Sequence, residues 1–324
     1  MIFRGKFSSL YRHLHRSAQF IGRRSWLIGI LSVLTVAGAL AAVNYVKIET
    51  QGAYRIILAN GIPNHPTGRF PNAHNPNTIS AQNYHFRVAV NPRKASRTTR
   101  LNMQDFGIAL NGVPFDPFTA EFWRRDRSSG WNYAAMTGKT DLGLDMNHAH
   151  VQPNGAYHYH GLPTDLVKGD NPSRHSSLLG YSADGFPIYG LYGFANPKSP
   201  SSGIKKLSSS YRLKKGTRPG GSSGPGGTYD GTFVQDFEYV AGLGDLDVCN
   251  GRDTVTPDYP TGTYAYFITQ SYPFIPRCYR GSPDSSFERG MAGGLGPPGG
   301  GRGGRLGPPP GGRPPPGGRP PPRR

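Results

Sequence analysis

The feature that most constrains this chain is a series of short runs in which apolar and polar residues alternate with a period of two. Clusters of Asn, Gly, Pro and Asp separate these runs. Such alternation is typical of strands with one buried face, and the clusters between them are typical of turns. The runs lie at residues 53–59, 84–90, 106–110, 156–160, 186–192, 232–240 and 263–269.

The composition agrees with a strand-rich body. Gly and Pro supply 46 and 31 of the 324 residues, which excludes a helical bundle or a coiled coil. One short helix is predicted from Asp116-Pro117, a typical N-cap and first-turn pair, towards Trp123. We therefore expect a mainly β protein: an antiparallel, sandwich-like or barrel-like single domain with long loops and little helix.

The net charge of +18 is confined to three segments. Residues 1–25, 197–227 and 290–324 carry 19 basic residues and no acidic ones, so the rest of the chain has a charge of −1. A nucleic-acid-binding domain would place its basic residues on structured elements among aromatic residues, so no nucleic-acid partner is expected. The basic loop and tail are instead suited to anionic polymers of a cell envelope.

The composition of these segments predicts how the chain is organised. The tail, residues 290–324, consists mostly of Gly, Pro and Arg and is expected to be disordered. Residues 197–227 are polar and rich in Gly and Ser, which indicates a flexible basic surface loop inside a domain that covers residues 50–289.

The N-terminus predicts export. Residues 26–43 carry no charge, follow two arginines, and end in several small residues. Residues 1–44 therefore read as an export signal, or as an uncleaved membrane anchor that spans residues 26–46. Either alternative places the domain in a periplasmic or extracellular space, with the membrane contacted only through this segment. In such a space the two cysteines, Cys249 and Cys278, are predicted to form a disulfide, with two buried free thiols as the alternative.

The segment that carries chemistry is DMNHAHVQPNGAYHYHG, residues 145–161, with two His-x-His pairs. On a strand, residues two apart share a face, so the histidines of each pair point the same way. Pro153-Asn154-Gly155 suits a three-residue hairpin loop, with Gly in the left-handed region. That loop would place His150 opposite His158, and His148 opposite His160.

All four imidazoles would then lie on one face, about 4.5–5.5 Å apart between opposing β-carbons. Tyr157 and Tyr159 would pack into the core on the other face. Four histidines without a thiolate favour copper or zinc over calcium or magnesium. The alternative is that one or two of them only make structural hydrogen bonds.

The segment also resembles the YHYH domain family, which is named after the motif at residues 157–160. The resemblance covers residues 50–282 and implies an exported domain without an established reaction. Where relatives often have Tyr-His-Tyr, this chain has Ala265 between two tyrosines, so a role of that histidine is missing or replaced here. The motifs that carry the resemblance are NGIPNHPTGRFPN (60–72), NGVPFDPFTAEFW (111–123), AHVQPNGAYHYHGLPT (149–164), GYSADGFPIYG (180–190), TYDGTFVQDFEYVAGLGDLDVCNGR (228–252) and YPFIPRC (272–278).

Further candidates surround this segment. His175 follows a turn and is expected either to join the site or to cap that turn. Asn147 and Asp184 are candidates for supporting the site or for forming turns. His65 and His74 lie in Pro- and Asn-rich loops and are expected to be solvated.

Two functions are consistent with these features. The first is an exported metal-binding domain with His148, His150, His158, His160 and His175 as candidate ligands; whether it is also an enzyme stays open. The alternative is a cell-envelope or carbohydrate-binding structural module without catalysis, for which 18 tyrosines and three tryptophans would supply stacking surfaces.

Overall fold

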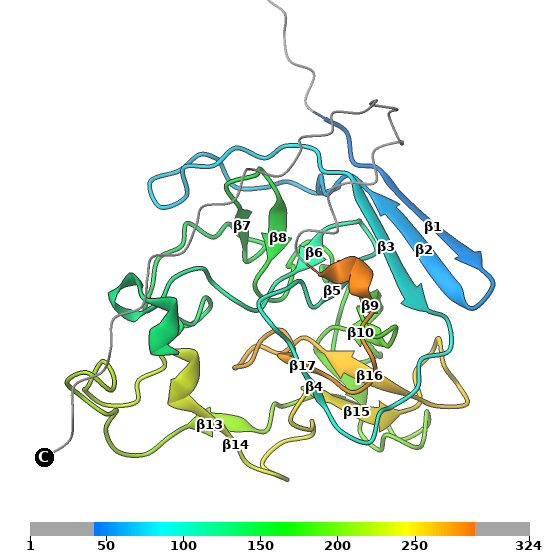
Figure 1. Cartoon of the computed structure of the whole chain (residues 1–324). Helices are drawn as coiled ribbons and strands as arrows, with labels where there is room; N and C mark the ends of the chain where they lie inside the picture. The colour runs from blue at the N-terminus through cyan, green and yellow to red at the C-terminus, as the bar shows by residue number, and fades with distance from the viewer. Residues whose placement is uncertain (1–41, 289–324) are drawn as a thin grey trace, which may run out of the picture. The chain divides into compact units, whose positions relative to one another are not determined.

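The computed structural model describes residues 42–288, and this part of the chain is mainly β (Figure 1). Within that range the helices are single 3₁₀ turns, at Trp123–Arg125, Arg127–Ser129, Val234–Asp236 and Ser285–Phe287. The predicted fold class is therefore confirmed, including the low helix content. No helix among the described residues is long and apolar enough to cross a bilayer.

The largest sheet has eight strands in the order β15-β16-β10-β9-β5-β6-β8-β7. The pairs β10–β16 and β6–β8 are parallel, and the other neighbours are antiparallel. Because β15 and β7 do not pair with each other, the sheet does not close into a barrel within the described residues. Its strands are β5 (Gly107–Ala109), β6 (Pro114–Phe115), β7 (Ala149–Val151), β8 (Tyr157–Tyr159), β9 (Leu178–Ser182), β10 (Pro187–Tyr189), β15 (Gly251–Thr254) and β16 (Thr263–Phe267).

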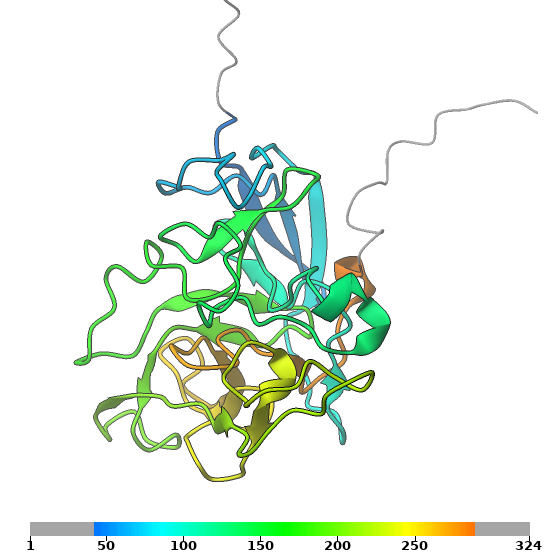
Figure 2. The same ribbon diagram turned by 90° about the vertical axis from the view of Figure 1, so that its left-hand side faces the viewer.

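A second, three-stranded antiparallel sheet contains β1 (Val46–Gln51), β2 (Tyr54–Ala59) and β3 (Tyr84–Ala89). Figures 1 and 2 show it at the end of the domain opposite to β13 and β14. Three two-stranded pairs complete the fold: β11 (Tyr192–Phe194) with β12 (Ile204–Lys206), β13 (Tyr211–Leu213) with β14 (Phe237–Tyr239), and β4 (Thr99–Arg100) with β17 (Cys278–Tyr279).

One hydrophobic core joins the two larger sheets. Ile57 and Phe86 enter it from the three-stranded sheet, while Phe115 and Tyr159 enter it from β6 and β8. All four side chains are fully buried, and burying one such side chain stabilises the fold by about 1.5–3 kcal/mol. The core therefore fixes the position of β8, next to the sheet's edge strand β7.

The predicted disulfide between Cys249 and Cys278 is present, with its α-carbons 5.1 Å apart. It joins the segment before β15 to β17 and closes a loop across 29 residues. A loop of that length contributes about 3–4 kcal/mol in the chain-entropy description of disulfides.

Residues 197–227 differ from the expected unstructured loop. They contain β12 and β13, which pair with strands on either side of the segment. Arg218 is nearly buried and forms ion pairs with Asp236, at 2.6 Å, and with Asp230. Three-residue strands are too short for their alternation to stand out from a polar, Gly-rich background, which is why the sequence indicated a loop.

The helix expected after Asp116 is also absent. The Asp116 carboxylate accepts a hydrogen bond from the backbone N–H of Phe118 at 2.9 Å, which makes a local turn. The first helical turn follows only at Trp123. An Asp-Pro pair supports both a helix start and such a turn, and here the turn forms. The tail and nearly all of the predicted export segment lie outside the described residues.

Candidate metal centre

The two His-x-His pairs lie on the hairpin β7–β8, in the predicted register. His150 is opposite His158, and Val151 is opposite Tyr157. The loop closes with a hydrogen bond from the Gln152 N–H to the Ala156 carbonyl at 2.9 Å. Gly155 has φ +85°, the left-handed conformation that the turn requires.

Three of the four histidines converge. Nε2 of His160 is 3.0 Å from Nε2 of His158 and 3.0 Å from Nε2 of His150. The potential ligand atoms of the three rings all lie within 4.8 Å of one another. His158 and His160 are almost fully buried. This cluster, called the His triad below, is the arrangement that can hold a metal ion.

Backbone carbonyls fix the tautomers of two of these rings. Nδ1 of His150 is 2.9 Å from the Leu142 carbonyl oxygen, and Nδ1 of His158 is 3.1 Å from the Ala156 carbonyl oxygen. A carbonyl oxygen can only accept, so each Nδ1 carries the proton. In the neutral ring, Nε2 is then left with a lone pair, and both lone pairs face the third ring.

The surroundings favour neutral imidazoles. Burial, followed by the neighbouring rings of His158 and His150, lowers the pKa of His160 well below its ordinary value. Burial also lowers the pKa of His150, although its hydrogen bond to Leu142 and the nearby carboxylates oppose this effect. Neutral imidazole is the form that binds a metal, so burial favours the form in which these candidate ligands could bind one.

The His triad is open on one side. His150 and His158 line a cavity of about 270 Å³, together with the carboxylates of Asp116 and Glu121 and the amide of Gln152. The cavity reaches the side chains of His150 and His158, whereas His160 does not line it.

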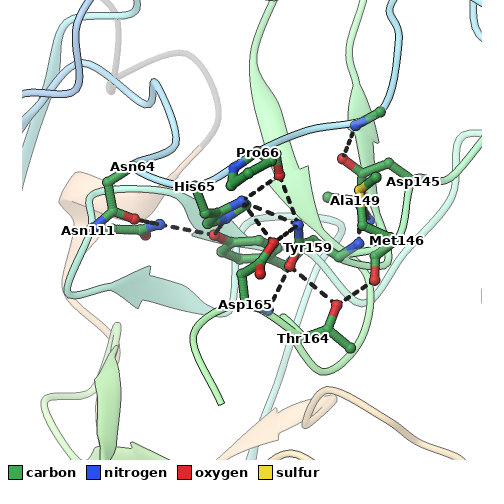
Figure 3. Close-up of polar contacts among 12 residues, drawn as sticks. Asn64, His65, Pro66, Asn111, Asp145, Met146, Ala149, Tyr159, Thr164 and Asp165 are labelled. Carbon is green, nitrogen blue, oxygen red and sulfur yellow. Dashed lines mark hydrogen bonds and ion pairs between the residues drawn. The ribbon is translucent and has the colours of Figure 1, made fainter. Parts of the chain in front are cut away.

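The tyrosines alternate with these histidines and point to the opposite face of β8. The Tyr157 hydroxyl donates to the Asp145 carboxylate at 2.7 Å. The Tyr159 hydroxyl is 2.6 Å from Nε2 of His65 and accepts from the Asn111 amide at 2.9 Å (Figure 3). Both rings are fully buried, so these hydrogen bonds fix β8 from behind the His triad.

His65 was expected to be solvated, and that expectation is wrong. Its side chain is only 6% exposed, and Nδ1 lies 2.9 Å from the Pro66 carbonyl oxygen (Figure 3). Nδ1 therefore donates to Pro66, and Nε2 accepts the Tyr159 hydroxyl proton. No local feature of residues 60–68 indicates this contact, because its partner is 94 residues further along the chain.

The family model described as "YHYH protein" matches residues 85–281, well over half of the chain. The chain belongs to the YHYH protein family. No curated protein and no solved structure matches it.

The YHYH motif thus consists of two imidazoles on one face of a strand and two hydrogen-bonded phenols on the other. Several residues that contact the motif precede the residues matched by the family model. Asn75 and Asn77 donate to the Val151 carbonyl at 2.9 and 2.7 Å, and the Ser80 N–H donates to the Gly155 carbonyl at 3.0 Å. Residues 60–82, called the N-terminal strap below, therefore hold the hairpin from outside.

His148 does not join the His triad of this YHYH protein. Its carbonyl accepts from the His160 N–H at 2.8 Å, as the register predicts, but its φ is +54°. This left-handed backbone precedes β7 and breaks the alternation of side chains, so His148 leaves the face that carries His150. Its Nδ1 instead contacts the Leu162 carbonyl oxygen at 2.7 Å.

His175 also lies away from the His triad. Its ring packs against Tyr189 and Phe194, with centroids 4.9 and 5.1 Å away, and Nδ1 is 2.8 Å from the Ser176 carbonyl oxygen. Ala265 is fully buried in a cluster with Tyr189 and Phe267.

The two supporting candidates occupy different places. Asn147 is buried on the tyrosine face, where its amide donates to the Pro66 carbonyl and to the Asp165 carboxylate, both at 3.0 Å. Asp184 lies in the turn between β9 and β10 and accepts from the Tyr266 hydroxyl and the Gly281 N–H, both at 2.7 Å. Burial raises the pKa of Asp184 despite these hydrogen bonds.

Proposed function

We propose that this protein binds a copper or zinc ion through His150, His158 and His160. The observation that carries the proposal is the convergence of three Nε2 atoms. The lone pairs of two of these atoms, in His150 and His158, point towards the third ring. The protein's own hydrogen bonds impose this orientation, because Leu142 and Ala156 hold the protons on the outer nitrogens.

A count of protons supports a cation at this point. The His triad contains two contacts between Nε2 atoms, both at 3.0 Å and both involving His160. A neutral His160 has at most one Nε2 proton, so it can donate to only one of the two neighbouring rings, and the other contact has no proton between its nitrogens. A protonated ring would relieve this, but burial opposes protonation of His150 and His160. A metal ion satisfies all three lone pairs at once.

The ligand set indicates which class of metal would bind and what chemistry it would supply. Three imidazoles without a thiolate suit a borderline divalent ion, which means copper or zinc before calcium or magnesium. Three protein ligands with an open side are typical of catalytic rather than structural zinc sites. Such a metal lowers the pKa of a bound water molecule. The Asp116 and Glu121 carboxylates on the cavity wall would be placed to accept a proton there. We therefore propose a metalloenzyme.

We further propose that the domain works outside the cytoplasm, in a periplasmic or extracellular space. The disulfide and the signal-like N-terminal sequence support this location. The alternative function, a carbohydrate-binding or cell-envelope module, is supported by a second cleft of about 740 Å³. Tyr259, Lys94 and Lys198 line this cleft, and Lys94 is ion-paired there with Asp253. Tyr259 and Lys198 would therefore be the groups that contact a polymer.

Metal analysis of the purified protein separates the two functions. The purified domain should take up about one equivalent of zinc or copper at pH 7.5 by calorimetry. His150→Ala should abolish or strongly weaken this uptake, whereas His85→Ala removes an exposed histidine on β3 and should leave it unchanged. Folded wild-type protein that takes up neither metal would contradict the proposal and favour the envelope-binding module.

A further inference from the structure

The histidine that the His triad excludes faces a cavity of its own. His148 lines a cavity of about 420 Å³ with Met136, Thr140, Asp141 and Leu142. None of the three triad histidines lines this space. Because Leu142 lines both cavities, the two lie side by side.

The His148 ring is held in a form that can bind a cation. The Leu162 carbonyl oxygen, 2.7 Å from Nδ1, keeps the proton on that nitrogen, so Nε2 has a free lone pair. The side chain is partly exposed, and no hydrogen bond to Nε2 occurs within residues 42–288. A non-glycine residue with φ +54° is uncommon, and here that conformation turns the ring towards the second cavity.

The Met136 thioether and the β-carbon of His148 lie on the same side of Gly161. A β-carbon placed on Gly161 would be 3.1 Å from Sδ of Met136 and 3.2 Å from Cβ of His148. The two side chains therefore approach the same point, and Gly161 leaves the space in which they do so. Met136 is partly exposed as well, and its unbranched side chain can adjust to a ligand.

We propose that His148 and Met136 form a second metal site, separate from the His triad, for a soft monovalent cation such as Cu(I). A thioether and an imidazole are neutral ligands that select Cu(I) over hard cations. Both cysteines of the chain are in the disulfide, so no thiolate competes for such an ion. This site goes beyond the proposed function and does not depend on it.

Silver(I) is a stable probe for such a site. In calorimetric titrations of the His150→Ala protein, in which the His triad is disrupted, we expect one equivalent of Ag(I) to bind. Met136→Leu and His148→Gln should each abolish this binding. Gly161→Ala keeps both ligands but displaces the Met136 thioether, and it should weaken binding about tenfold, as changes around metal ligands commonly do.

NMR of the protein with methionine labelled at its methyl carbon tests directly whether Met136 binds the ion. The Met136 methyl resonance should shift on addition of Ag(I), while that of Met146, an exposed methionine, should stay in place. Zinc uptake by the His triad should be unchanged in Met136→Leu, so failure of one site would leave the other intact. Ag(I) binding that survives Met136→Leu and His148→Gln, or a Met136 resonance that does not respond, would overturn the proposal.

Discussion

At the scale of single residues, hydrogen-bond direction decides what the YHYH motif can do. Each histidine of the motif turns Nε2 towards the same point, and each tyrosine directs its hydroxyl to a partner on the other side of β8. One strand thus combines candidate metal ligands with the groups that hold them in place. Metal ligands in proteins commonly depend on such supporting hydrogen bonds.

Protonation of the His triad makes the first prediction. His150 and His160 have pKa values below the ordinary value of about 6.5, so the unfolded chain binds protons before the folded one does. The part of the metal-free protein's stability that depends on these two neutral histidines is therefore fully present above pH 6.5 and is lost as the pH drops below it. Urea unfolding at pH 7.5 and 5.5 should show this loss, and His150→Ala should show less of it. Equal pH dependence in both proteins would contradict the assignment.

The second prediction concerns Tyr159. Replacing it with Phe leaves His65 Nε2 and the Asn111 amide without their shared partner in a largely buried place. We expect a loss of about 1–3 kcal/mol in the free energy of unfolding. Metal affinity should fall about tenfold although every ligand remains. Tyr45→Phe, at an exposed tyrosine, is the control and should change neither quantity. Unchanged zinc affinity in Tyr159→Phe would show that the tyrosine face does not position the ligands.

At the scale of elements, the hairpin shows how far the sequence could lead. The register of β7 and β8 was predictable because Pro153, Asn154 and Gly155 select one loop length, and a slip by one residue would reverse every side chain. His148 was misplaced because strand alternation was extended one residue too far. The left-handed backbone at that position has no signal in a His-Ala-His sequence.

The N-terminal strap could not be predicted for a different reason. Asn75 and Asn77 contact Val151 of the hairpin, which lies 76 and 74 residues further along the chain, and their Pro- and Asn-rich surroundings indicate only a loop. Side-chain amides that bind distant carbonyls leave no periodic pattern. The sequence thus predicted the local half of the site, and tertiary contacts supply the other half.

The third prediction tests the strap and the turn together. At Gly155, with φ +85°, an added β-carbon would overlap the Ser80 hydroxyl and press on the Thr78 carbonyl oxygen. At Gly52, with φ +59°, it would meet open space. Gly52→Ala should therefore cost about 1 kcal/mol from the left-handed backbone alone. Gly155→Ala should cost more and should also weaken zinc binding. Equal stability of the two variants by denaturant unfolding would show that the strap does not press on the turn.

At the scale of the whole molecule, composition predicted the class of fold but not which segments are ordered. The mainly β body follows from the turn chemistry and from the alternation of its longer strands, such as β3. Residues 197–227 have a composition typical of a flexible loop, yet ion pairs of Arg218 and pairing with β11 and β14 build them into the domain. Disorder of residues 290–324 stays a prediction, because they lie outside the described part of the chain.

The last prediction concerns the disulfide and the compartment in which it forms. Cys249 is fully buried, and its bond to Cys278 ties the end of the eight-stranded sheet to the β4–β17 pair. Cys249→Ser/Cys278→Ser should lower the free energy of unfolding by about 3–4 kcal/mol, since the open loop gains entropy in the unfolded chain. Zinc uptake by the folded variant should persist, because neither cysteine belongs to the His triad. The oxidised wild-type protein treated with a reductant is the matched comparison, and its melting temperature should fall towards that of the variant. If reduction left the melting temperature unchanged, the disulfide would not stabilise the domain, and an oxidising compartment would not be needed for its stability.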